Sequence, residues 1–144
     1  MSAQSKVLIT GASSGIGSVY ADRFAQRGYH LILVARDTNR LDKISKDLQE
    51  KCGVQVEFIQ ADLSNDQDIR KIEDVLKNDA DIEILVNNAG IALNGNFLTQ
   101  DRNEIEKLLT LNMTAVVRLS HAMSQSLIRK GKGAIINLGS VLGL

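Results

Sequence analysis

The residues best suited to chemistry come early in the chain, in a glycine-rich stretch from Thr10 to Gly17. Glycines occupy positions 11, 15 and 17, directly after an apolar, β-branched run and directly before a stretch of helical period. A helix N-terminus presents unpaired N–H groups and about half a positive charge, and glycine lets a phosphate approach closely. Gly11 suits a tight turn, Gly15 can face a phosphate, and Gly17 lets the helix pack near the strands. This order predicts a phosphate-binding turn, with a turn that serves packing alone as the alternative.

A second candidate group stands where the second apolar run ends, at Ala35, Arg36 and Asp37. In a dinucleotide-binding sheet this position meets the adenosine ribose, where an acidic side chain hydrogen-bonds a free 2′-hydroxyl. Ala35 stands where that acid would be, and Arg36 can place two hydrogen bonds on a 2′-phosphate. Ser13 and Ser14 could add hydroxyl donors. We therefore predict NADP(H) in preference to NAD(H). Asp37 could oppose this by repelling the phosphate, and the alternative for Arg36 is an ordinary solvated charge.

Two polar residues in the second half of the chain could carry catalysis. Asn112 interrupts an apolar stripe that runs from Ile105 to Leu127, and a buried amide must be hydrogen-bonded or it costs about 1–3 kcal/mol. Ser140 follows the last apolar run, at the edge where open α/β sheets bind substrates. Its hydroxyl could stabilise negative charge that develops on a carbonyl oxygen. The alternatives are a core asparagine and an ordinary turn serine.

The elements that must position these residues alternate along the chain. Short β-branched runs predict strands over 6–10, 30–35, 54–59, 82–86 and 134–138. Apolar residues three or four apart predict four helices. The first covers 15–27, and the second contains Leu41 and Leu48 and ends at Gly53. The third begins at a capping box formed by Ser64 and Gln67, and the fourth runs from a cap at Asp101, with Glu104, to near Gly131. Such an alternation predicts right-handed βαβ units. We expect an α/β fold, a Rossmann-type doubly wound parallel sheet in the strand order 3-2-1-4-5.

The glycine spacing, Gly-x-x-x-Gly-x-Gly, resembles the cofactor loop of the short-chain dehydrogenase/reductase family. Four further motifs of that family recur in order. They are Asp62-Leu63 after the third strand, Asn87-Asn88-Ala89-Gly90 after the fourth, Leu111-Asn112 in the long helix, and Asn137-Leu138-Gly139-Ser140 after the fifth. The resemblance covers positions 10 to 140, and five motifs in order are far more specific than any one of them.

The resemblance implies a role for each matching position. The residues that would bind the dinucleotide are Gly11, Ser13, Ser14, Gly15, Ile16, Gly17, Arg36, Asp62, Leu63, Asn88, Ala89 and Gly90. Asp62 would face the adenine ring, Asn112 would hold a water in the proton relay, and Ser140 would orient and polarise the substrate carbonyl. The implied reaction is hydride transfer between a nicotinamide and a carbonyl or alcohol, so the resemblance implies an oxidoreductase.

The resemblance is incomplete at the catalytic acid. In the family a tyrosine, with its pKa lowered by a lysine four residues on, protonates the substrate oxygen. Here Tyr20 and Tyr29 are followed four residues later by Phe24 and Leu33. We therefore expect residues 1–144 to be a single NAD(P)-binding Rossmann domain that lacks the C-terminal part of the family fold and is inactive alone. The alternatives are a non-catalytic dinucleotide-binding or sensor module and, disfavoured by the Asn-Asn-Ala-Gly motif, another Rossmann-like enzyme such as a methyltransferase.

Composition limits the partners. A chain of 144 residues, 44% hydrophobic and 24% charged, fits one soluble globular domain. Seventeen basic residues balance seventeen acidic ones, which argues against a nucleic-acid or anionic-membrane partner. No apolar run approaches the ~20 residues that span a bilayer, and no His, Cys or carboxylate group has metal-ligand spacing. With Cys52 as the one cysteine, we expect a cytoplasmic protein with a small-molecule substrate and no metal. Homo-oligomer formation is left open.

Overall fold

The computed structural model describes residues 5–140, in which five parallel strands form one sheet in the order β3-β2-β1-β4-β5. The strands are β1 (Lys6–Thr10), β2 (His30–Ala35), β3 (Val56–Gln60), β4 (Ile82–Asn87) and β5 (Ala134–Asn137). This confirms the expected Rossmann-like α/β fold and its strand order. The third strand lies one to two residues later than predicted, and the fifth ends one residue earlier.

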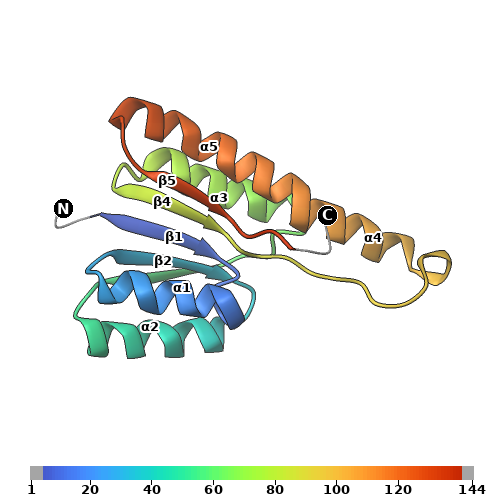
Figure 1. Ribbon diagram of the computed structural model, residues 1–144, viewed down its shortest axis with the longest axis horizontal. Coiled ribbons are helices and arrows are strands. Elements are labelled where there is room, and N and C mark those ends of the chain that lie inside the picture. Colours follow the sequence, from blue (N-terminus) through green and yellow to red (C-terminus); the bar gives the residue numbers. More distant parts are fainter. Residues whose placement is uncertain (1–4, 141–144) are drawn as a thin grey trace.

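Helices cover both faces of the sheet (Figure 1). On one face lie α1 (Gly15–Gln26) and α2 (Thr38–Cys52), and on the other lie α3 (Asp66–Asn78) and α5 (Ala115–Lys130). A helix α4 (Arg102–Leu109) and a π-helical turn, Thr110–Thr114, precede α5 directly. A short 3-10 turn, Phe97–Thr99, lies in the segment before α4. Among residues 5–140 no helix has the length and apolar character needed to cross a membrane.

The sheet is buried on both faces because its central strands carry continuous apolar runs, such as 7–9 in β1 and 31–35 in β2. In β1, Val7 and Ile9 pack with α1 and α2, whereas Leu8 packs on the side of α3 and α5. Successive side chains of a strand point to opposite faces, so one apolar run supplies both halves of the core. The carboxyl ends of the strands all reach the same edge of the sheet, at the right in Figure 1.

Three of the predicted helix ends are confirmed, and one is wrong. The α5 helix ends at Lys130, with Gly131 as its left-handed C-cap. Gly53 closes α2 in the left-handed conformation, with φ at 68°, and the Asp101 carboxylate accepts from the N–H groups of Asn103 and Glu104 at the start of α4. The α3 helix is capped by Asn65, which accepts from the Asp68 N–H at 2.9 Å, and not by Ser64. The Ser64 hydroxyl instead donates to Asp62, which leaves the capping position to the next residue.

The long helical segment follows its predicted stripe in part, at Leu119 and Met123. Ile105, Leu108, Val116 and Leu127 are only partly buried, as is Asn112. The fully buried side chains of this segment include Ala115, Leu119, Ala122 and Met123. Ile105 and Leu108 belong to α4, which has no fully buried residue, and the π-helical turn that follows it contains Asn112, where the stripe is interrupted.

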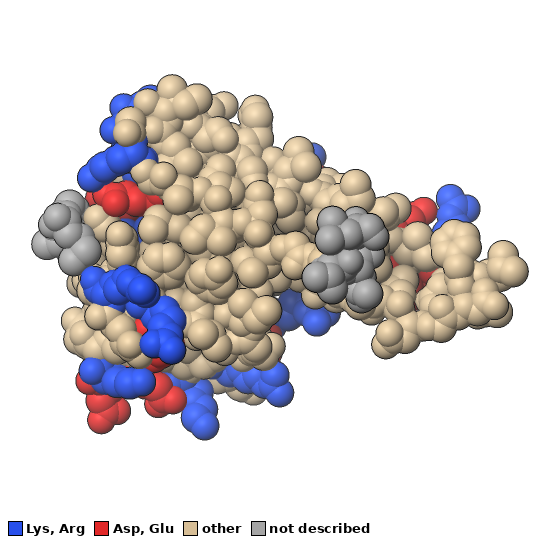
Figure 2. Space-filling model, viewed as in Figure 1, with Lys and Arg blue, Asp and Glu red and all other residues tan. Residues whose placement is uncertain are grey.

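Charged side chains are mixed in sign on the face seen in Figure 2, where Lys and Arg side chains beside α1 and α2 have acidic neighbours. Between the helices of the other face, Arg118 on α5 donates to Asp66 at 2.6 Å and also pairs with Glu73, both on α3. Arg118 and Glu73 are partly buried and Asp66 is exposed, and ion pairs near the protein surface each add little. The packing of α3 on α5 therefore rests mainly on apolar contact through residues such as Ile72 and Leu119.

Replacing Leu119 by alanine is expected to destabilise the fold by about 2–5 kcal/mol, because this side chain is 1% exposed and its removal leaves a cavity. The matched control is Val117→Ala, two residues away on the same helix, where the side chain is 67% exposed. The control should change the free energy of unfolding by no more than about 0.5 kcal/mol. Urea unfolding followed by circular dichroism measures both. Equal losses in the two variants would contradict the described core.

Candidate functional site

A cavity of about 650 Å³ lies at the carboxyl edge of the sheet. It is lined by the glycine turn, the end of β2, the start of α2, the segment after β3, the segment after β4 and the π-helical turn. The lining residues are Gly11, Ser13, Ser14, Val34, Ala35, Arg36, Asp37, Arg40, Ala61, Asp62, Leu63, Asn88, Ala89, Gly90, Ile91 and Leu111. The predicted dinucleotide-binding residues therefore line one space, apart from Gly15, Ile16 and Gly17. A volume of this size is typical of a small-molecule or cofactor site.

The glycine turn has the conformation that its sequence requires. Gly11 and Gly15 have φ values of 64° and 54°, in the left-handed region that side chains disfavour. A Cβ at Gly17 would collide with the carbonyl oxygen of Gly11, whereas a Cβ at Gly15 would meet nothing within 4 Å. Gly17 thus allows α1 to begin close to the strand end. Open space at Gly15 is what the approach of a phosphate needs.

The start of α1 has donors available. Ser14 is the N-cap residue, and its side chain makes no capping hydrogen bond. The first N–H groups of a helix lack partners within the helix, so a capping side chain, water or a ligand must satisfy them. Combined with the helix dipole, this arrangement suits an anionic group. Ile16, on the first turn of α1, is 60% exposed and does not line the cavity.

A buried threonine joins the glycine turn to the segment after β4. The Thr10 hydroxyl accepts from the N–H groups of Asn88 and Ala89, both at 3.0 Å, and donates to the Val86 carbonyl at 3.4 Å. The Asn88 side chain in return donates to the carbonyls of Thr10, at 3.2 Å, and Gly11, at 3.1 Å. These bonds fix two walls of the cavity relative to each other. Sequence reasoning did not identify Thr10, because its partners lie 78 and 79 positions further on.

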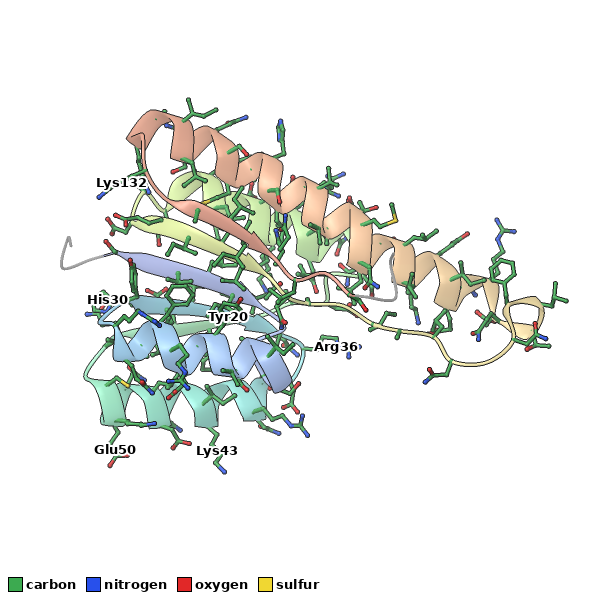
Figure 3. The ribbon with its side chains drawn as sticks, viewed as in Figure 1. Tyr20, His30, Arg36, Lys43, Glu50 and Lys132 are labelled. Carbon is green, nitrogen blue, oxygen red and sulfur yellow. The ribbon has the colours of Figure 1, made fainter. Side chains whose placement is uncertain are left out.

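At the end of β2, Arg36 extends outward at the carboxyl edge (Figure 3). No ion pair of Arg36 occurs within the described part of the chain. Asp37 is the N-cap of α2: its Oδ1 accepts from the Arg40 N–H at 3.0 Å, and its Oδ2 lies 3.4 Å from Arg40 Nε. The carboxylate that could oppose a phosphate is therefore paired with a neighbouring cation. Arg40 was not among the residues that the sequence singled out.

Asp62 lies at the opposite wall and is ionised. Its Oδ1 accepts from the Ser64 hydroxyl at 2.6 Å and the Ser64 N–H at 3.0 Å. Partial burial raises the pKa of Asp62, but the Ser64 hydrogen bonds and the positive charges of Arg36 and Lys107 outweigh it and hold that pKa below the ordinary 3.8. The next residue, Leu63, is buried. This wall thus offers an anionic acceptor beside an apolar surface.

The Asn112 side chain is engaged on both sides by one residue. Its Oδ1 accepts from the Ile91 N–H at 2.9 Å, and its Nδ2 donates to the Ile91 carbonyl at 2.8 Å. The amide thus ties the segment after β4 to the π-helical turn. The structure shows the satisfied asparagine that sequence analysis gave as the alternative. The predicted role of Asn112 in holding a water stays a prediction.

The end of β5 is tied to β4 by two asparagines that are register partners. Asn87 Nδ2 donates to Asn137 Oδ1 at 2.9 Å and to the Ser120 hydroxyl of α5 at 3.1 Å. Ser140 follows β5 at the same edge of the sheet and is exposed. Its predicted contact with a substrate stays a prediction. Between residues 5 and 140, no group of three or more His, Cys, Asp or Glu side chains is arranged to hold a metal ion.

Comparisons with known proteins identify relatives of the whole described chain. The family model for short chain dehydrogenase matches residues 5–144. A short-chain dehydrogenase from Sphingobium yanoikuyae, solved in complex with NADPH, is 52% identical with a TM-score of 0.95, over 96% of this chain and 54% of that one. The bulky-bulky ketone specific alcohol dehydrogenase from Comamonas testosteroni is 45% identical with a TM-score of 0.96, over 99% of this chain and 57% of that one.

A curated relative is more distant. The very-long-chain 3-oxoacyl-CoA reductase of Coccidioides immitis (strain RS) is 31% identical over 142 residues, which are 95% of this chain and 40% of that protein. The chain thus spans a little over half the length of the two solved relatives and less than half of the curated one.

Replacing Ser64 by alanine is expected to raise the pKa of Asp62 toward its ordinary value, because both a hydroxyl donor and the local turn geometry depend on this serine. A carboxyl with a lowered folded pKa adds stability above its unfolded pKa and loses it as the pH falls through the folded pKa. Ser64→Ala should therefore lose stability at neutral pH and show a weaker acid dependence below about pH 4. Carboxyl NMR titration and unfolding at several pH values measure both effects. An unchanged Asp62 titration would contradict the assignment.

Proposed function

The chain belongs to the short-chain dehydrogenase family of oxidoreductases, and from that premise we propose that it binds NADP(H) for hydride transfer between the nicotinamide and a carbonyl or alcohol substrate. The observation that carries the proposal is the single cavity that gathers the glycine turn, Arg36, Asp62 and the segment Asn88–Gly90. Each of these groups suits one chemical part of a dinucleotide. A helix N-terminus suits the pyrophosphate, a cation suits the 2′-phosphate, and an acceptor suits the adenine amine.

In this proposal the adenosine lies between the end of β2 and the segment after β3. Ser64 occupies one oxygen of the Asp62 carboxylate, which leaves the other free to accept from the exocyclic adenine amine. Leu63 and Leu111 supply apolar surface for the ring, and both line the cavity. Asn88, Ala89 and Gly90 complete the wall beside the ribose and are held in place by Thr10.

Three features of this chain and one of a relative support NADP(H) over NAD(H). Ala35 stands in the position of the acidic residue that would bind a free 2′-hydroxyl. Arg36 lines the cavity without an ion-pair partner among the described residues, so its guanidinium is available to a phosphate. Asp37 is paired with Arg40, which reduces its repulsion of the phosphate. The relative from Sphingobium yanoikuyae was solved with NADPH.

For the reaction itself, the bound cofactor supplies or accepts the hydride. Ser140 hydrogen-bonds the substrate oxygen and stabilises the negative charge that develops there. The Asn112 amide is committed to Ile91, so we propose that a relay water is held by a main-chain carbonyl of the π-helical turn rather than by this amide. The side chain of Asn112 then positions the turn, and the water depends on it indirectly.

Proton donation to the substrate oxygen needs a group that residues 1–144 do not offer. Tyr20 and Tyr29 lack a lysine four residues on, and both rings contact Phe24. The Tyr20 ring stacks on Phe24 at a centroid distance of 6.2 Å, and the Tyr29 ring meets it edge-on at 5.5 Å. They serve the packing of α1. A non-catalytic dinucleotide-binding module is the second candidate for the same observation. A reading frame that continues past Leu144 into a Tyr-x-x-x-Lys motif would separate the two.

We further propose that residues 1–144 form a single domain of a cytoplasmic protein and that its substrate is a small-molecule carbonyl or alcohol.

Arg36→Ala is expected to weaken NADPH binding by roughly 10-fold or more, because a charge-assisted hydrogen-bonded contact contributes about 1.5–3 kcal/mol. NADH binding should change by less than about twofold, since NADH lacks the 2′-phosphate. Titration of cofactor fluorescence measures both dissociation constants. The control is Arg129→Ala, an exposed arginine in the last turn of α5. An unchanged preference for NADPH in Arg36→Ala would refute the assignment of the 2′-phosphate to this residue.

The 144-residue chain is expected to bind NADPH without oxidising it, because the acid that would protonate the substrate oxygen is missing from its sequence. Absorbance at the NADPH band, followed with a broad panel of ketones and aldehydes, measures turnover. The binding titration with the same preparation serves as the control for folded protein. Turnover with any carbonyl would show that a residue within 1–144 replaces the family's tyrosine.

A further inference from the structure

Arg40, in the first turn of α2, is the one cavity-lining cation besides Arg36 within residues 5–140. Its Nε lies 3.4 Å from the Asp37 carboxylate, and its main-chain N–H donates to the same carboxylate at 3.0 Å. The side chain is 64% exposed, so its outer part is accessible from the cavity and from solvent. Both arginines and the aspartate thus border the same end of the cavity.

We propose that Arg40 is a second 2′-phosphate-binding residue that acts in two ways at once, as a donor to the phosphate and as the partner that masks Asp37. The proposal rests on the proposed function, since it assumes that this cavity takes NADP(H). It assigns the cofactor preference to a three-residue unit, Arg36, Asp37 and Arg40, rather than to Arg36 alone.

The donor inventory of arginine permits both roles. A guanidinium carries five N–H donors, of which the Nε–H faces Asp37. The four donors on the terminal nitrogens remain, and a phosphate has three oxygens that accept in a bidentate manner. Lysine at this position would offer one compact ammonium group, which could serve the carboxylate or the phosphate but not both with the same geometry.

The charges of the unit explain why Arg40 matters more than one added cation. With Arg40 present, two positive charges and one negative charge surround the phosphate. Without it, the charges of Arg36 and Asp37 cancel, and the carboxylate loses its partner side chain. The main-chain N–H at position 40 would still cap onto Asp37, so the unmasked charge would stay beside the cavity. Loss of Arg40 therefore both removes an attraction and restores a repulsion.

The competing explanation is that Arg40 only supports the start of α2. An exposed i,i+3 ion pair adds little to stability, and the Asp37 cap already satisfies the helix end through the main chain. In that case the removal of the guanidinium would alter stability slightly and would affect NADPH and NADH alike. The two explanations therefore differ in cofactor selectivity, which is directly measurable.

The test compares the dissociation constants of NADPH and NADH for wild type, Arg40→Ala, Arg40→Lys and Lys43→Ala at low and moderate salt. Arg40→Ala is expected to weaken NADPH about 10-fold or more and NADH less than twofold. Arg40→Lys should fall between wild type and Arg40→Ala. Lys43 is the matched control, because it is an exposed cation of the same helix that points away from the sheet and does not line the cavity (Figure 3). Its removal should leave both constants within twofold.

A double variant separates masking from simple attraction. Asp37→Asn keeps a good helix cap, since asparagine caps as well as aspartate, but it removes the negative charge. Added to Arg40→Ala, it should recover several-fold of the lost NADPH affinity. Alone, it should improve NADPH binding by less than about threefold, because Arg40 already masks the carboxylate. A purely structural role of Arg40 predicts no such recovery.

Four results would overturn the proposal. If wild type bound neither cofactor, the proposed function would fail and this inference with it. If wild type preferred NADPH but Arg40→Ala kept that preference within twofold, only the inference would fail. The same holds if Arg40→Ala weakened NADPH and NADH equally, or if Asp37→Asn recovered nothing in the double variant. Circular dichroism of each variant confirms that the fold is intact.

Discussion

The site depends on one buried hydroxyl, that of Thr10. It accepts two main-chain hydrogen bonds from Asn88 and Ala89, and the Asn88 side chain bonds back to the carbonyls of Thr10 and Gly11. The turn after β1 and the segment after β4 therefore move as one body. Because these residues are largely shielded from water, loss of either partner would leave polar groups unsatisfied, at a cost of about 1–3 kcal/mol each. These hydrogen bonds hold two walls of the cavity, the turn after β1 and the segment after β4, in place relative to each other.

Three asparagines connect β4 and the segment after it to the π-helical turn, β5 and α5. Asn112 hydrogen-bonds both the N–H and the carbonyl of Ile91, so the π-helical turn is held against the segment after β4. Asn87 reaches across to Asn137 and Ser120, so the end of β5 and helix α5 follow β4. Amide side chains suit this work because each both donates and accepts, and can bridge two main-chain or side-chain groups of opposite polarity. Polar side chains thus hold the carboxyl edge of the sheet together, whereas the middle of its central strands is apolar.

The sequence alone predicted what local chemistry determines. Continuous apolar runs predicted the strands, glycine spacing predicted the turn before α1, and Gly53 and Asp101 marked helix ends correctly. Features set by distant contacts were not predictable in this way. Thr10 bonds residues far along the chain. The interruption of the apolar stripe at Asn112 marks the place of the π-helical turn but not its wider bonding. Within a single turn, the Ser64 hydroxyl bonds Asp62, and Asn65 caps α3 instead. Arg40 lies only four positions after Arg36, but its place in the cavity lining is seen only in the folded structure.

The distribution of the cavity lining along the chain has a thermodynamic consequence. Its residues come from positions between 11 and 111, on separate strands and helices that only the folded state assembles. A ligand that contacts all of them binds the native state and not the unfolded chain, so it shifts the folding equilibrium by mass action. At a concentration 100 times its dissociation constant, such a ligand adds about 2.7 kcal/mol to stability. A bound dinucleotide would therefore stabilise the packing of β1, β2 and β3 against the segment after β4, and its release would remove that stabilisation.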